Sequence, residues 1–160
     1  QESAYALLKE AGLSYSSSIY APAGTLLQKA GIWELPVSTL RLFGDDSDHS
    51  YTAPRDFSFG LVLRGEIPYG SSFTIGMLSA RILKILEGEL KAGRSQVIIL
   101  HPYELVRPSN WPGRVARDLL QNPLLWPFTW NKAAFLSRLI RELPVSPLGT
   151  YLDEVLTSQA

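Results

Sequence analysis

The chain has 160 residues, of which 46% are hydrophobic, 11% aromatic and 19% charged, and this is the length and composition of one folded domain. Its 15 lysines and arginines balance 15 aspartates and glutamates without a basic run, which argues against nucleic acid or an anionic membrane surface as a partner. The chain has no cysteine, which excludes disulfides and thiolate chemistry, and no apolar stretch approaches the roughly 20 residues of a membrane span.

The start of the chain has neither an initiating methionine nor the basic and apolar pattern of a signal peptide. We therefore expect a processed or excised piece of a longer protein, with a natural short protein as the alternative. Apolar residues at helical spacing predict a helix over residues 3–11 that stops at Gly12. Residues 15–19 then predict a strand, and residues 32–37 predict another that ends near Pro36.

A polar stretch over residues 44–55 predicts a loop, and the alternating apolar residues of 57–63 predict a strand after it. Carboxylates surround the one histidine of this loop: the cluster consists of Asp45, Asp46, Asp48 and His49. The cluster lacks the spacing of a calcium loop and has too few nitrogen ligands for a closed zinc site. We interpret it as a solvated acidic loop.

The clearest helix of the sequence is predicted over residues 73–91, where one apolar stripe follows two serines that are suited to cap it. After Gly93, residues 97–100 form the aliphatic run Val-Ile-Ile-Leu, which is typical of a strand buried on both faces in a parallel sheet. Helix, tight turn and buried strand together are half of a βαβ unit.

The C-terminal part of the chain is predicted to be helical, with helices over residues 112–120, 131–143 and 150–156. Trp126 and Trp130 lie between the first two of these helices. We expect both indoles to fill a core beneath them.

His101 directly follows the aliphatic run, and Pro102 turns the chain away after it. Ligands of α/β sheets and barrels bind at the carboxyl ends of strands, so a titratable side chain here is well placed for function. Because side chains alternate along a strand, Ile99 and His101 are expected to point the same way. The imidazole could act as a general acid near neutral pH, or its ring nitrogens could be satisfied by loop backbone.

Aromatic and hydroxyl side chains offer further candidates. Trp33, Trp111 and Tyr103 could present flat faces to sugar rings in an exposed cleft. Ser71 or Ser72 could be drawn into a serine, histidine and acid set with His101, but spacing alone gives such a set little support. No signature of a hydrolase elbow, a nucleotide fold or a zincin occurs.

Three sequence blocks, in order, carry a resemblance to a family. They are Tyr-Ser-Ser-Ser-Ile-Tyr-Ala-Pro at 15–22, Ile-Trp-Glu-Leu-Pro-Val-Ser-Thr-Leu-Arg at 32–41, and Ile-Ile-Leu-His-Pro-Tyr-Glu-Leu at 98–105. The chain resembles the C-terminal half of polysaccharide deacetylases, the NodB-homology enzymes of carbohydrate esterase family 4, especially the exopolysaccharide-associated branch with its C-terminal extension.

The resemblance implies an α/β fold that is part of a distorted (β/α) barrel with its N-terminal strands missing. Residues 1–106 would be the C-terminal half of that barrel, and residues 107–160 a helical extension packed on it. The implied activity is metal-dependent hydrolysis of N-acetyl groups on an amino-sugar polymer. His101 matches the late histidine that protonates the departing amine, and Ile99 matches the apolar residue that helps to hold the acetyl methyl. Only these two roles are carried over from the family. Trp33 and Tyr103 are expected as further substrate contacts on the strength of their flat aromatic rings.

The chain also departs from the family pattern, in two respects that bear on activity. The family's blocks that hold the catalytic base and the ligands of a divalent metal, zinc or similar, are not in this chain, so we expect the chain alone to hold no metal and to be inactive. Ser16 stands where the branch has an aspartate paired with the catalytic histidine, and loss of that carboxylate removes a charge that favours the imidazolium. The resemblance also suggests an extracytoplasmic or cell-envelope location.

Other interpretations stay open at this point. The chain could be a non-catalytic carbohydrate-binding or interaction module on the same scaffold, or, with less support, a serine esterase. Because an incomplete barrel exposes sheet edges, we expect the 160 residues to need the missing N-terminal segment or another chain for solubility.

Overall fold

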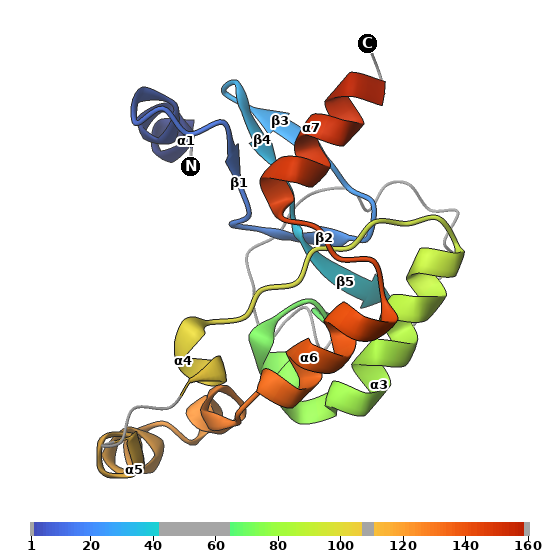
Figure 1. Cartoon of the computed structure of the whole chain (residues 1–160). Coiled ribbons are helices and arrows are strands. Elements are labelled where there is room, and N and C mark those ends of the chain that lie inside the picture. The colour runs from blue at the N-terminus through green and yellow to red at the C-terminus, as the bar shows by residue number, and fades with distance from the viewer. Residues whose placement is uncertain (1, 42–64, 107–110, 159–160) are drawn as a thin grey trace.

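The computed structural model describes residues 2–41, 65–106 and 111–158 as a mixed α/β structure (Figure 1). In chain order its elements are α1 (Glu2–Glu10), β1 (Tyr15–Ser16), β2 (Tyr20–Pro22), β3 (Leu27–Lys29), β4 (Ile32–Glu34), β5 (Val37–Arg41), β6 (Glu66–Ile67), α3 (Ser72–Lys91), α4 (Pro102–Leu105), α5 (Trp111–Gln121), the 3₁₀ helix η2 (Pro123–Thr129), α6 (Ala133–Glu142) and α7 (Leu148–Ser158). The predicted loop 44–55, with His49 and its aspartates, and the predicted strand 57–63 lie outside the described residues.

The described strands form two small sheets, in the orders β1-β4-β3 and β2-β5-β6. β1 pairs with β4, and β2 with β5, in parallel, whereas β3 and β6 join antiparallel to β4 and β5. The predicted strand over 15–19 ends at Ser16, and Pro36 falls between β4 and β5. The described strands close no barrel, and the barrel stays a prediction.

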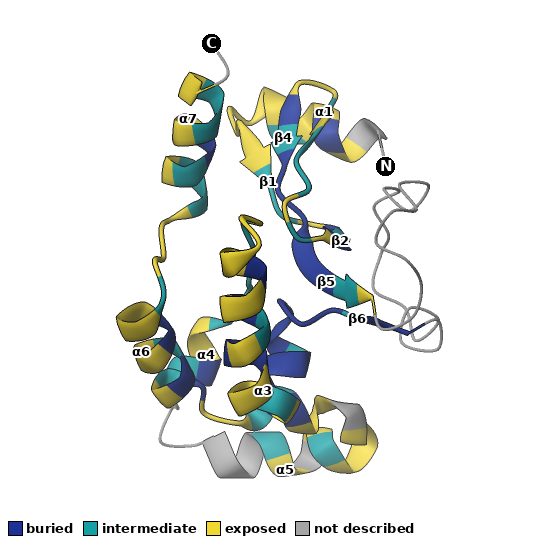
Figure 2. Cartoon of the chain, turned by 90° about the vertical axis from the view of Figure 1, so that its right-hand side faces the viewer, coloured by how far each residue is buried: buried dark blue, intermediate teal, exposed yellow. Residues whose placement is uncertain are grey.

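Helix α3 confirms the longest predicted helix almost to the residue. Ser71 is its N-cap, and the Ser71 hydroxyl accepts a hydrogen bond of 3.3 Å from the backbone N–H of Thr74. Figure 2 shows the helix buried on one face and exposed on the other, as its sequence pattern requires. The buried face forms the larger hydrophobic core with residues before the helix and on α6: Tyr69, Ile75, Ile82, Leu83, Leu86, Phe135 and Leu139.

Two glycines of α3 are expected to respond in opposite directions to alanine. A Cβ on Gly76 would lie 2.3 Å from the carbonyl oxygen of Pro127, because η2 packs directly on this helix. Gly76→Ala therefore forces the two elements apart and should lower the free energy of unfolding by about 1–3 kcal/mol. Gly88 has open space at that position, and Gly88→Ala should raise it by about 0.5–1 kcal/mol.

Urea unfolding of the two glycine variants beside the parent protein measures both changes. Each variant serves as the control for the other, since both add one methyl group to the same helix. A Gly76→Ala protein as stable as the Gly88→Ala protein would contradict the close packing of η2 on α3.

The predicted strand over residues 97–100 is corrected by the structure, which assigns no strand there. The segment is nevertheless hydrogen-bonded at alternate residues. The Ser38 N–H donates to the Val97 carbonyl at 3.0 Å, and the Ile99 N–H donates to the Gly70 carbonyl at 2.8 Å. Each of these neighbours contributes only isolated bonds, so no continuous ladder forms, and only Val97 of the four side chains is buried.

The C-terminal helices pack into the same body as the strands. Leu152 of α7 joins Leu35 and Val97 in a second, smaller core, while α6 supplies part of the larger one. Helix α6 begins at Ala133, two residues after the start of the helix predicted over 131–143, and the Asn131 side-chain oxygen accepts a hydrogen bond of 2.8 Å from the Ala133 N–H. The region after residue 106 therefore has no described core of its own.

The expectation that Trp126 and Trp130 fill a core is wrong, since they are 55% and 41% exposed. Both lie around the short 3₁₀ helix η2, where Pro127 is the residue buried against α3. The indoles of Trp126 and Trp130, on either side of Pro127, are exposed to solvent. Within the described part of the chain, no helix has the length and apolarity to cross a bilayer.

Candidate functional site

A cavity of about 660 Å³ lies beside His101, within the size range of small-molecule sites. Five parts of the chain line it: the turn between β1 and β2 with the first residue of β2, the start of β5, the start of α3 with the residue before it, the end of the 97–100 segment with His101, and η2 with the residue before it. Its lining is mostly apolar, with one imidazole, one amide and several hydroxyls as the polar groups. They come from Ser17, Ser18, Tyr20, Ser71, Ser72, His101 and Asn122.

The imidazole of His101 is half-buried between two hollows. It stacks on the ring of Tyr103, with centroids 5.0 Å apart and planes 7° from parallel, and it meets Phe128 at 6.4 Å in a tilted arrangement. On its other side a second cavity of about 430 Å³ is lined by Tyr103, Asp118 and Thr129 among others. Among the described residues, no hydrogen bond to either ring nitrogen is found, so the described loop backbone does not satisfy the ring.

The predicted pairing of Ile99 with His101 is seen in the structure, because both side chains line the 660 Å³ cavity. Tyr103 lines the second cavity and covers one face of the imidazole. Burial raises the pKa of the Tyr103 phenol, and the carboxylate of Glu104 raises it further. This phenol is therefore a neutral hydrogen-bonding group at neutral pH.

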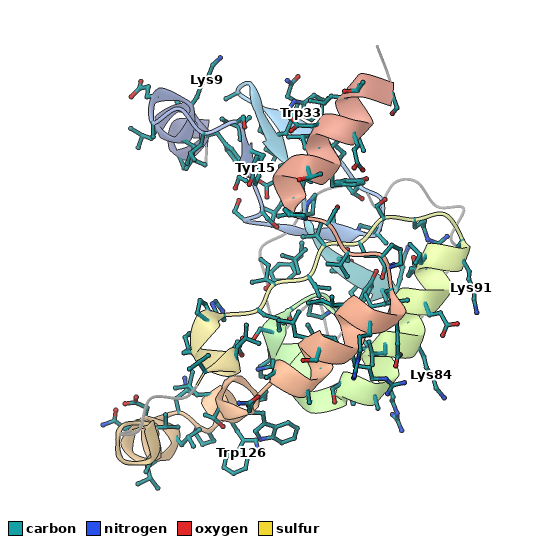
Figure 3. All side chains as sticks on the ribbon, viewed as in Figure 1. Lys9, Tyr15, Trp33, Lys84, Lys91 and Trp126 are labelled. Carbon is teal, nitrogen blue, oxygen red and sulfur yellow. The ribbon has the colours of Figure 1, made fainter. Side chains whose placement is uncertain are left out.

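Trp33 does not share this site. It lies on β4 against the smaller core, and Figure 3 shows it beside α7, at the opposite end of the molecule from Trp126. The side chain of Trp111 lies outside the described residues. Among the side chains that the structure describes, no tryptophan lines the two cavities at His101.

The serines near the imidazole are engaged elsewhere. The Ser71 hydroxyl caps α3, and the Ser72 hydroxyl donates to the carboxylate of Glu104. Neither forms a hydrogen bond to His101 in the described structure, so the serine esterase interpretation finds no nucleophile and base pair. Ser16 does not line the cavity, but the hydroxyl of Ser17 does lie there, buried and without a partner among the described residues.

A buried ion pair fixes the backbone that presents the imidazole. Glu104 and Lys132 are 1% and 3% exposed, and their side chains form a salt bridge. The Glu104 carboxylate also accepts from the Ser72 hydroxyl, and from the His101 N–H at 2.7 Å. The Lys132 ammonium donates to the Pro127 carbonyl at 3.0 Å. The Glu104 carboxylate of α4 thus connects three places in the chain: Ser72 at the start of α3, Lys132 just before α6, and the backbone N–H of His101.

Sequence reasoning missed this ion pair, although half of it had a local signal. Glu104 stands three residues after His101 with a proline between them, which is the spacing of a capping interaction at a short helix. Lys132 had no such signal, because it comes from a part of the chain that only folding brings near.

A second buried carboxylate shapes the other side of the cavity. Glu34 is fully buried and accepts from the Ser18 N–H at 2.5 Å, from the Ile19 N–H at 3.3 Å and from the Tyr5 hydroxyl at 3.0 Å. These bonds hold the turn that carries Ser17 against the cavity. The role of Glu34 is therefore to position the turn.

The described residues offer no ligand set for the metal that the resemblance implies. No group of three or more histidine, cysteine, aspartate or glutamate side chains gathers anywhere in the described ranges. The buried carboxylates nearest the cavity, Glu34 and Glu104, accept hydrogen bonds from hydroxyls, N–H groups and one lysine.

Comparison with known proteins returns no match for this chain to any family model, curated protein or solved structure.

Proposed function

We propose that this chain is the C-terminal part of a metal-dependent polysaccharide N-deacetylase, with His101 as the acid that protonates the departing amine. One observation carries the proposal. An imidazole whose nitrogens are unbonded within the described structure lines a cavity of about 660 Å³ together with Ile99. This leaves the ring nitrogens available to a ligand in the cavity, whereas the nitrogens of a fully buried structural histidine are normally hydrogen-bonded by the protein.

The chemistry assigns a separate task to each side chain. Hydrolysis of an N-acetyl group adds a water oxygen to the acyl carbon and then breaks the carbon–nitrogen bond. The nitrogen leaves as an amine only if it gains a proton, and a histidine imidazolium can give one near neutral pH. Ile99 offers apolar surface to the acetyl methyl beside that proton donor, and Tyr103 fixes the plane of the imidazole by stacking.

The catalytic base and the ligands of the divalent metal would come from residues outside this chain. When bound, the metal would activate the attacking water. The proposal therefore includes a missing N-terminal segment or another chain as partner, with an amino-sugar polysaccharide as substrate. By itself the chain is expected to release no acetate.

The direct test is acetate release from N-acetylglucosamine oligomers by the protein extended with the residues encoded upstream of Gln1. Oligomers that have already lost their acetyl groups are the matched control substrate. The proposal predicts metal-dependent acetate release from the first set only. An extended protein that binds the acetylated oligomers but releases no acetate at any metal concentration contradicts it.

The exposed indoles favour one alternative, a non-catalytic carbohydrate-binding module. Trp126 and Trp130 are both more than one-third exposed, and flat aromatic faces of this kind suit sugar rings. Under this alternative, oligosaccharides quench tryptophan fluorescence without turnover. Trp126→Ala should then weaken binding, whereas substitution of Ile99 in the cavity should leave it unchanged.

A further inference from the structure

One stretch of the chain builds the second cavity, the one of about 430 Å³ beside the His101 imidazole. All of its described lining comes from residues 101–129, which include α4, α5 and η2. Aliphatic and aromatic side chains form most of its walls, with a few polar groups among them, which is the composition of a small-molecule site. The polar groups are those of His101, Tyr103, Asp118 and Thr129.

Asp118 gives the second cavity a negative charge without a counter-charge. It is the only carboxylate among the described residues of the lining, which include no lysine or arginine. Its carboxylate makes no hydrogen bond or ion pair with any residue that the structure describes, whereas the carboxylates of Glu104 and Glu142 are paired with Lys132 and Arg138. An unpaired carboxylate in a cavity favours a cationic occupant over a neutral or anionic one.

The other groups of the lining favour an amine as that cation. A divalent metal is disfavoured, because it needs several ligands and the described residues gather no such group. An ammonium carries N–H donors, and the Asp118 carboxylate and the Thr129 hydroxyl can accept from them. The Thr129 hydroxyl donates its own proton to the Trp126 carbonyl at 2.7 Å, so its oxygen meets a ligand as an acceptor. The ring of Tyr103 is 40% exposed and offers a flat face to a sugar ring.

We propose that the second cavity is a subsite for an amino sugar that has already lost its acetyl group, with its ammonium paired to Asp118. This inference rests on the proposed function, in which a neighbouring unit presents its N-acetyl group to the 660 Å³ cavity. His101, Leu125 and Phe128 line both cavities, so consecutive units of one polymer can lie on the two sides of the imidazole. The substrate class is therefore a partly deacetylated polysaccharide, in which each reaction makes the amine that the next one uses.

Binding to the protein extended with the residues encoded upstream of Gln1, kept free of metal by a chelator, tests the subsite without turnover. Titration calorimetry compares N-acetylglucosamine oligomers that carry a single free amine with fully acetylated oligomers of the same length. The oligomers with the amine should bind at least about tenfold more tightly. This preference should shrink as salt is added, because an ion pair at an exposed carboxylate is screened.

Two matched variants separate the subsite from the general charge of the surface. Asp118→Asn keeps the size of the side chain and removes its charge, so it should abolish the preference for the amine. Asp153→Asn removes the same charge from an exposed position on α7 and should leave the preference unchanged. The oligomer comparison and the salt series use the parent protein and remain decisive if the Asp118 variant fails to fold.

Three results would overturn the subsite. The first is equal binding of the two oligomers by the parent protein, and the second is a preference that persists in Asp118→Asn. The third is a preference shown by the 160-residue chain but lost in the extended protein, which would mean that the N-terminal segment fills the cavity itself. Acetate release without the preference refutes the subsite alone, whereas an Asp118-dependent preference without acetate release refutes the deacetylase alone.

Discussion

Replacing His101 by alanine should lower kcat by roughly 10²–10⁴-fold in the protein that carries the complete site, which is the usual contribution of a positioned general acid. The departing nitrogen would then leave without a proton from the enzyme. Acetate release from N-acetylglucosamine oligomers, with kcat and KM determined separately, measures the change. The effect should fall mainly on kcat, because the proton is needed in the transition state.

Adding imidazole to the solution distinguishes a catalytic acid from a side chain that only shapes the cavity. His101→Ala leaves an empty space in the cavity, and a free imidazole that enters it should restore part of the rate. A side chain that only shapes the cavity would not be rescued in this way. An unchanged rate in the alanine variant would show that the assigned role is wrong.

Local rules predicted the parts of the fold that depend on neighbouring residues. The stripe of α3 and its serine start gave the helix and its cap, and the polar side chain of Asn131 marked the start of α6 within two residues. Alternation along residues 97–100 correctly placed Ile99 and His101 on one side. Each of these depends on contacts within a few positions of chain.

The features of the fold that the sequence did not predict depend on contacts between distant parts of the chain. The run at 97–100 has the composition of a buried strand, but whether both edges are paired depends on which segments lie beside it. Trp126 and Trp130 are large apolar residues typical of a core, but Pro127 of the 3₁₀ helix η2 is buried between them and both indoles are exposed to solvent. The lining of the cavities by α5 and η2 likewise follows from how the C-terminal region packs back.

The difference between local and distant contacts also explains why the sequence carries a signal for Glu104 of the buried ion pair but none for Lys132. Glu104 lies three residues from His101, so a capping rule applies to it. Lys132 reaches it across 28 positions, and a buried lysine has no periodic signature. Its burial is intelligible only once its carboxylate partner is known, because a charged group is rarely buried unpaired.

Removing the Glu104 carboxylate should therefore destabilise the protein more than any other single substitution considered. Glu104→Ala leaves the ammonium of Lys132 buried without its counter-charge, and loss of one partner of a buried pair costs about 3–5 kcal/mol. It also frees the His101 N–H and the start of α3, so it should disorder the imidazole as well. The midpoint of urea unfolding measures the first effect, and the exchange rate of the His101 amide measures the second.

A double variant tests whether the cost comes from the uncompensated charge. Glu104→Gln combined with Lys132→Met removes both charges and keeps one acceptor oxygen for the His101 N–H, while the amide NH₂ can donate to the Ser72 hydroxyl oxygen in place of the bond that this hydroxyl donates to Glu104. It should be more stable than Glu104→Gln alone, since replacing both partners of a buried pair is often close to neutral. Glu142→Gln breaks the exposed pair with Arg138 and should leave the midpoint unchanged. If the double variant is no more stable than the single one, the buried charge of Lys132 is not the origin of the loss, and Glu104 acts through its hydrogen bonds to Ser72 and His101 instead.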